Sequence, residues 1–172
     1  NNIYLGAFIL IFMLLAASFI TLRNTKIQNR KEYGLILGAI AVSGLIHLGL
    51  ICYFILDLKT YNPQYIIPIA GMIFASIMNV LSIAIERFYK ELSFNEDFEL
   101  ARNSSLKTAL IPQINSLLAV GLVSLPGMMT GQILSGVDPM IAVRYQIMIM
   151  SMIVSSSGIA IVVYFTLKRK YV

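Results

Sequence analysis

Long apolar runs separated by short polar segments are the main pattern of the sequence. Apolar residues fill each run almost without interruption, which is typical of helices that cross a membrane. About 20 residues suffice for a helix to cross a hydrocarbon core of about 30 Å. We therefore predict an all-α, polytopic helical membrane protein with five transmembrane helices, at residues 3–22, 34–56, 66–85, 109–125 and 140–167.

The composition supports a membrane protein and excludes a water-soluble domain. The chain has 172 residues, of which 58% are hydrophobic and only 12% are charged, whereas soluble domains have about 25% charged residues. Cys52 is the single cysteine, which excludes an internal disulfide bond. The excess of positive charge does not indicate a nucleic-acid partner, because its distribution along the chain predicts a membrane topology.

Basic residues gather in alternate connections between the predicted helices. The first and third connections and the C-terminal tail carry eleven lysines and arginines, whereas the second and fourth carry only Lys59 and Arg144. Because connections rich in lysine and arginine stay in the cytoplasm, we expect the N-terminal end outside and the C-terminus in the cytoplasm. We also expect the chain to be a multi-pass protein of the plasma membrane, and, since it begins with Asn1, to be a piece of a longer protein.

The third connection, residues 86–107, has mixed charges and a helix signal. Ser93 followed by Glu96 has the spacing of a capping box, which predicts a short cytoplasmic helix that starts at Ser93. Phe94 and Phe98 are four residues apart, so both rings would lie on one face. Two interpretations stay open: the helix lies on its own bundle or on the lipid surface, or its aromatic face binds a partner.

Polar side chains recur at helical spacing inside three of the predicted spans. Asn79 and Ser82 belong to such a stripe in the third span, Met148 lies in a similar stripe of the fifth span, and Asn115 lies in the fourth. Polar residues within a membrane seldom face lipid, so these face other helices or a transport path. Packing alone and a path both remain possible explanations.

Pro126 and Gly127 interrupt an apolar run, where we predict a break in the fourth helix. Proline removes a backbone hydrogen bond and glycine lowers helix propensity. We expect the break within about two residues of Pro126 and a second short helix or re-entrant turn up to Gly136. Broken helices at membrane depth are tolerated where they line a cavity, and we expect Ser124, Met128 and Met129 beside it.

Several other patterns carry less information. Ser43 and His47 are one turn apart, but no G-x-S-G surrounds the serine and no acid is near to orient the histidine, so a protease is rejected. Gly34 and Gly38 form a G-x-x-x-G pair, a weak signal for helix contact. The nine methionines are soft metal ligands or flexible gap-fillers, and for any one of them we favour the second role.

Four stretches occur in an order that resembles a known family. They are "IPIAGM" (67–72), "ALIPQINS" (109–116), "VGLVSLPGMMTGQILSGVDP" (120–139) and "VRYQIM" (143–148). The chain resembles the FetB-like permeases, the membrane subunits of an iron-exporting ABC transporter, to which plant aluminium-tolerance permeases also belong. Members of that family have further helices before the point at which this chain starts, and a longer cytoplasmic loop.

The resemblance implies a single transmembrane permease domain over residues 1–172. Such a subunit moves iron, another metal ion or a small solute out of the cytoplasm, and a separate ATPase subunit supplies the energy. We expect a homodimer of permease subunits in the lipid bilayer, no nucleic-acid partner, no cofactor on this chain and ATP on the partner. Ser93, Phe94, Phe98 and Arg102 are the residues that we expect to couple to the ATPase.

The sequence leaves the substrate and its ligands open. The candidate residues of the translocation path are Asn79, Ser82, Asn115, Ser124, Met128, Met129 and Met148. No catalytic residues are expected, because the chain has few titratable residues and no G-x-x-x-x-G-K-[ST] motif for binding phosphates. The alternatives are a structural membrane scaffold without a path and an intramembrane enzyme, which the scarcity of titratable residues disfavours.

Overall fold

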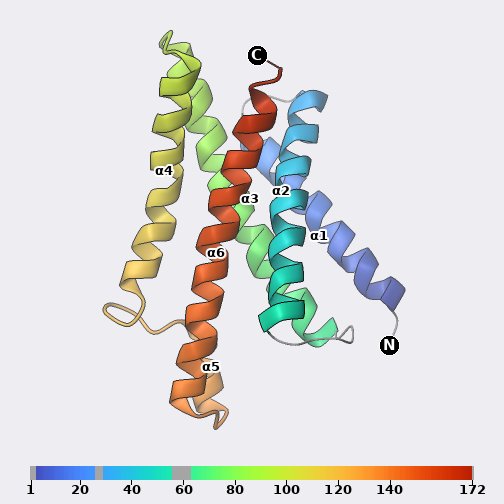
Figure 1. Ribbon diagram of the computed structural model, residues 1–172, viewed down its shortest axis with the longest axis vertical. Coiled ribbons are helices and arrows are strands. Elements are labelled where there is room, and N and C mark those ends of the chain that lie inside the picture. The colour runs from blue at the N-terminus through green and yellow to red at the C-terminus, as the bar shows by residue number, and fades with distance from the viewer. Residues whose placement is uncertain (1–2, 26–28, 56–62, 172) are drawn as a thin grey trace.

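The computed structural model is a bundle of helices (Figure 1) and describes residues 3–25, 29–55 and 63–171. The helices are α1 (Ile3–Asn24), α2 (Arg30–Leu50), α3 (Pro63–Ser93), α4 (Phe98–Ala119), α5 (Gly127–Leu134) and α6 (Pro139–Lys168). A short π-helical segment, η1 (Ile51–Ile55), continues α2. The prediction of an all-α polytopic protein is confirmed. Three residues used in the predictions lie outside the described residues: Lys26 and Lys59 of the predicted loops, and Leu56 of the predicted second span.

Helix α3 is the centre of the bundle. It packs against α1, α2, α4 and α6, and α2 also packs along α6. Large side chains with no exposed surface fill the space between these helices, among them Ile77, Leu81 and Phe88 of α3 and Tyr164 of α6. Helix α5 packs against α6.

Four of the described helices are long and apolar enough to cross a membrane: α1, α2 with η1, α3 and α6. The predicted count was five, and α4, which contains the predicted fourth span, differs from the other four. Its first half is polar, and it ends at Ala119 rather than at Leu125. The apolar part, residues 109–119, is only about 16 Å long at 1.5 Å per residue, too short to cross a hydrocarbon core alone.

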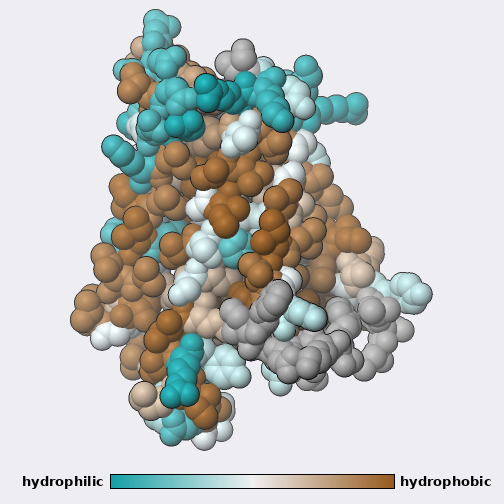
Figure 2. Space-filling model, viewed as in Figure 1, coloured by the Kyte–Doolittle hydropathy of each residue, from teal (hydrophilic) through white to brown (hydrophobic). Residues whose placement is uncertain are grey.

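The polar ends of the helices gather at one end of the bundle. The end of α1, the start of α2, the α3–α4 turn and the C-terminus lie together there (Figure 1), and Figure 2 shows hydrophilic side chains concentrated at the same end. The described parts of the lysine- and arginine-rich connections therefore share one side of the bundle, as the alternation of charges requires. Which side of the membrane this is stays a prediction.

The start of α4 differs from the prediction, because no separate helix begins at Ser93. Ser93 is the last residue of α3, and its hydroxyl donates a hydrogen bond to the Lys90 carbonyl at 2.6 Å. A turn follows, with Asn95 at a positive φ of 60°, a conformation that asparagine tolerates better than most residues. Asp97 then caps α4 by accepting a hydrogen bond from the Glu99 amide at 3.2 Å. The predicted cytoplasmic helix is thus the first part of α4.

A glycine that was not predicted to matter lies at a close contact between α2 and α3. A Cβ atom on Gly44 of α2 would lie 2.5 Å from the Phe74 ring of α3, so only glycine fits there without a shift. The predicted pair is less important. A Cβ on Gly34 would meet nothing within 4 Å, and one on Gly38 would make an ordinary 3.6 Å contact with Leu167.

Candidate functional site

The predicted helix break and the short helix after it are both present, but the interruption begins at the end of α4, earlier in the chain than predicted. Helix α4 ends at Ala119, residues 120–126 are not helical, and α5 starts at Gly127. Gly121 has a positive φ of 82°, a conformation that favours glycine and ends many helices. The Ala119 carbonyl accepts hydrogen bonds from the amides of Val123 at 2.9 Å and Ser124 at 3.2 Å, and these bonds hold the turn together.

Pro126 therefore starts a helix rather than bending one. It occupies the N-cap position of α5 with extended backbone angles (φ −61°, ψ 139°). A proline at a helix start loses no hydrogen bond, because the first amides of a helix have no partner within it. The Pro126 carbonyl accepts from the Thr130 amide at 3.0 Å and from its hydroxyl at 3.1 Å.

The candidate path residues do not form an enclosed site within the described chain. None of the seven is buried: Asn79, Asn115, Ser124 and Met128 are exposed, and Ser82, Met129 and Met148 are partly exposed. The Ser82 hydroxyl turns to its own helix and donates to the Met78 carbonyl at 2.8 Å. Met148 packs against the hydrophobic core, which fits a gap-filling role. The polar stripes thus lie on outer faces of this bundle.

Different polar residues join the helices inside the bundle. The Ser43 hydroxyl of α2 donates to the Ser156 carbonyl of α6 at 2.6 Å, and the His47 Nδ1 lies 2.7 Å from the Ser43 carbonyl. The hydroxyls of Ser76 in α3 and Ser157 in α6 are 2.8 Å apart. Gln113 extends this contact to α4, since its Nε2 donates to the Ser76 hydroxyl at 3.1 Å.

A second polar cluster lies at the polar end of the bundle and was missed by the sequence reasoning. Glu32 of α2 is buried and accepts hydrogen bonds from Tyr89 of α3, at 3.1 Å, and from Tyr164 of α6. Lys168 of α6 forms an ion pair with it at 2.5 Å and also donates to the Tyr89 hydroxyl. We refer to Glu32, Tyr89, Tyr164 and Lys168 as the Glu32 cluster.

The Glu32 cluster joins three helices through one carboxylate. A buried ion pair is tolerated when further hydrogen bonds satisfy its remaining polar atoms, and the two tyrosine hydroxyls do so here. The sequence contained a signal for this cluster. Glu32 is an acid at the start of an apolar run, and its partners lie at the ends of the two other runs that were predicted to end on the same side.

The structure places the predicted coupling residues in different environments. Phe94 lies in the α3–α4 turn and is 67% exposed. Phe98 instead turns inward, where its ring meets that of Phe88 edge to face with centroids 5.3 Å apart. The expectation of two aromatic rings on one exposed face is therefore wrong, because α4 begins after Phe94. Arg102 pairs with Glu99 at 2.6 Å.

The described residues offer no compact set of the side chains that most often bind metal ions. No group of three or more histidine, cysteine, aspartate or glutamate side chains is close enough to hold a metal ion in the part of the chain that the structure describes. Glu32 is already paired with Lys168, and His47 is the single histidine of the sequence. Backbone carbonyls and methionine thioethers are the other ligand types at hand.

Comparisons with known proteins identify similar sequences. The sequence model of the uncharacterised protein family UPF0014 matches residues 1–102 and 92–172. UPF0014 membrane protein slr1647 of Synechocystis is 32% identical over 188 residues, which cover 99% of this chain and 73% of that protein. The probable iron export permease protein FetB of Escherichia coli is 34% identical over 128 residues, or 64% of this chain and 49% of that protein.

A plant protein is also similar. Protein ALUMINUM SENSITIVE 3 of Arabidopsis thaliana is 27% identical over 165 residues, covering 87% of this chain and 59% of that protein. These matches confirm the resemblance on which the sequence analysis relied. The Synechocystis alignment spans more positions than this chain has residues, so that relative contains residues with no counterpart here. No solved structure matches the chain.

Proposed function

Since the chain belongs to the UPF0014 family, whose model matches it in two overlapping parts from residue 1 to 172, we propose that it is the permease subunit of an ABC exporter. The subunit carries iron, another metal ion or a small solute out of the cytoplasm. The relative named as a probable iron export permease supports this assignment. The polar end of the bundle, with the C-terminus, is cytoplasmic in this proposal, and the membrane is the plasma membrane.

The observation that carries the proposal is the set of polar side chains on outer faces of the spanning helices. Asn79 of α3 and Ser151 and Ser155 of α6 are exposed, and both helices are apolar enough to span. Figure 2 shows pale and hydrophilic side chains between apolar ones along the middle of the visible face. Because such residues seldom face lipid, these faces meet another polypeptide or an aqueous path.

A path completed outside this chain explains why the candidate residues are not enclosed. We propose that two permease subunits associate, and that the polar faces of both subunits border the path. The interrupted segment 120–126 and α5 then lie beside it, where non-helical backbone at membrane depth is tolerated. Ser124 and Met128, both exposed in the single chain, contribute an hydroxyl and a thioether there.

The energy for transport comes from an ATPase subunit in this proposal, and ATP binds to that partner. The α3–α4 turn is the docking element, because it projects from the polar end of the bundle (Figure 1) with the exposed Phe94 ring. Exposed Glu96 and Asp97 follow the ring. A hydrophobic ring beside acidic side chains suits a groove with basic residues on its rim.

Reconstitution tests the proposal. The chain is purified with the ATPase that co-purifies with it and placed in liposomes, and ATPase activity and efflux are measured across a panel of metal ions and small solutes. We expect at least one solute to stimulate hydrolysis and to move in an ATP-dependent manner. Asn79→Ala should reduce that efflux, whereas Thr166→Ala, an exposed residue bonded only to its own helix, should not.

The competing explanation is a structural scaffold without a path. It predicts that no ATPase co-purifies, that no solute crosses, and that Asn79→Ala has no effect on any transport signal. This result, obtained with a folded chain, would contradict the proposed function.

A further inference from the structure

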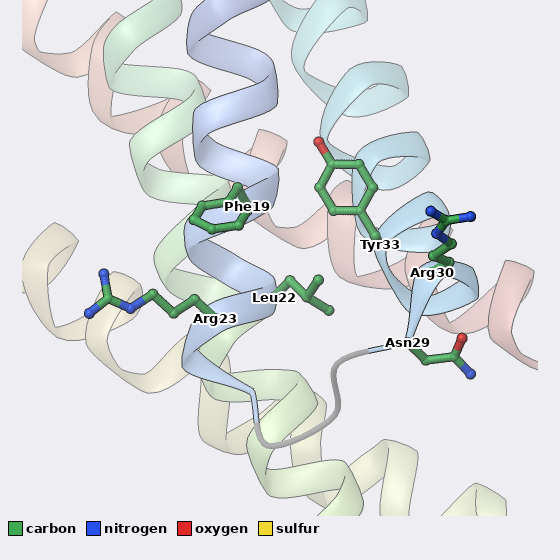
Figure 3. A pocket seen from close by; sticks show the side chains of 6 residues that line it. All are labelled: Phe19, Leu22, Arg23, Asn29, Arg30 and Tyr33. Atoms are coloured by element: carbon green, nitrogen blue, oxygen red, sulfur yellow. The ribbon is translucent and has the colours of Figure 1, made fainter.

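A pocket lies between the end of α1 and the start of α2, at the polar end of the bundle. Its volume is about 590 Å³, and Figure 3 shows the side chains that line it: Phe19, Leu22, Arg23, Asn29, Arg30 and Tyr33. None of these residues belongs to the proposed path or to the Glu32 cluster. The pocket sits at the polar ends of two helices that are long and apolar enough to span a membrane.

The wall of the pocket between the two helices is apolar. Leu22 projects from α1 toward the space between the two helices, and the Tyr33 ring of α2 lies across from it (Figure 3). Phe19, also on α1, is 60% exposed. Tyrosine at such a boundary presents an apolar ring to acyl chains and a hydroxyl to headgroups. The wall therefore suits a hydrocarbon chain rather than a hydrophilic solute.

Two arginines border this wall without acidic partners. Arg23 and Arg30 are exposed, and no ion pair or hydrogen bond of their side chains occurs within the described residues. The other arginines near this end and Lys168 differ from these two, since Arg87, Arg102, Lys168 and Arg169 each lie within 4 Å of a glutamate oxygen. In Figure 3 the two free guanidinium groups extend away from each other, on either side of the space between Leu22 and Tyr33.

We propose that this pocket binds one anionic phospholipid of the adjoining leaflet. The acyl chain lies along Phe19, Leu22 and Tyr33, and the headgroup phosphate meets Arg30, with Arg23 on the opposite side. Charge complementarity selects the lipid, because basic pockets between spanning helices attract anionic headgroups. Arginine also matches phosphate geometry with two parallel donors. A zwitterionic lipid carries a cation of its own, which the two arginines repel.

Native mass spectrometry with competing lipids tests this site. The protein is released from micelles that contain equal amounts of phosphatidylglycerol and phosphatidylcholine, and the retained lipid is counted. We expect preferential retention of phosphatidylglycerol. Arg23→Gln with Arg30→Gln should weaken that retention roughly thirtyfold, as expected for the loss of two basic residues near an anionic lipid. Arg23→Lys with Arg30→Lys keeps the charge and should retain most of the binding.

The matched control removes two charges from the same end of the protein. Lys31 and Lys170 are exposed and do not line the pocket, so Lys31→Gln with Lys170→Gln should leave retention within about threefold of wild type. Equal retention of the two lipids by the wild type would overturn the proposal, as would an equal loss in both glutamine variants. Displacement of phosphatidylglycerol by inorganic phosphate alone would show a free-anion site instead of a lipid site. The inference does not depend on transport, because lipid retention is measured without ATP or an ATPase.

Discussion

Replacing Glu32 by leucine tests whether the Glu32 cluster holds α2, α3 and α6 together. Glu32 has 3% of its side chain exposed and Lys168 has 12%, and their atoms are 2.5 Å apart. Removing the carboxylate leaves a largely buried ammonium without a counter-charge, with only its hydrogen bond to Tyr89, and two tyrosine hydroxyls without their acceptor. Breaking a buried pair on one side costs about 3–5 kcal/mol. We expect about 3 kcal/mol, the lower end, because Lys168 is at a helix end and can extend toward water.

The double variant separates the cost of an unpaired charge from the cost of losing the cluster. Glu32→Leu with Lys168→Met replaces both charges by apolar side chains, which is often nearly neutral. We therefore expect most of the stability to return, with the remaining loss near 1 kcal/mol for each tyrosine that still lacks an acceptor. The free energy of unfolding is measured in mixed micelles by titration with a denaturing detergent, with helix content followed by circular dichroism.

The control for this cycle is Glu96→Leu, since Glu96 is exposed in the α3–α4 turn and exposed acids contribute little. A loss below about 1 kcal/mol for Glu32→Leu would refute the reasoning. A double variant as unstable as the single one would also refute it, because the cost would then come from packing around leucine and not from an unpaired lysine.

Two further predictions concern packing. Gly44→Ala should destabilise the bundle by about 1–3 kcal/mol, because the new methyl group would overlap an aromatic ring of α3. Gly34→Ala has open space and should be neutral or slightly stabilising. The free energies of unfolding of the two variants are compared in mixed micelles, and equal effects would contradict the close contact. Phe98→Ala should lower the free energy of unfolding by about 2–3 kcal/mol, somewhat less than the loss of a fully buried phenylalanine. Phe94→Ala should leave stability unchanged and weaken co-purification of the ATPase. A Phe98→Ala variant as stable as wild type would show that the ring contact contributes little.

Features set by local sequence were predictable. The apolar runs determined the helical class and four of the spanning helices. The start of α6 also follows a general local rule, an acidic cap followed by proline, since the Asp138 carboxylate accepts a hydrogen bond from the Met140 amide at 2.9 Å. Local signals failed where two of them competed. Ser93 and Asp97 both have side chains that can cap a helix, and the structure selects Asp97, so the predicted start was four residues too early.

Features that depend on which helices meet were not predictable from one sequence. The spacing of Phe94 and Phe98 indicated a shared face but did not show that only the second ring lies in a helix and turns toward Phe88. Likewise, Glu32 and Lys168 are 136 residues apart, and only the packing of α2 against α6 brings them together. Proline was a visible breaker, yet the positive φ of Gly121 ends α4 before Pro126 is reached.

Helix α3 carries both a buried and an exposed polar residue, and the difference between them bears on what surrounds the bundle. Ser76 is buried and bonds to Ser157 of α6, while Asn79, three residues later, is exposed. A short hydroxyl can be satisfied inside a close helix contact or by its own helix, whereas the larger amide of asparagine needs partners of its own. A side chain of that kind on a spanning helix is costly in lipid. The outer face of α3 therefore requires contact with protein or water rather than lipid, and the described helices of this chain do not cover it. That requirement is independent of any relative's name, and it supports the proposal that a transport path lies between this bundle and a second polypeptide.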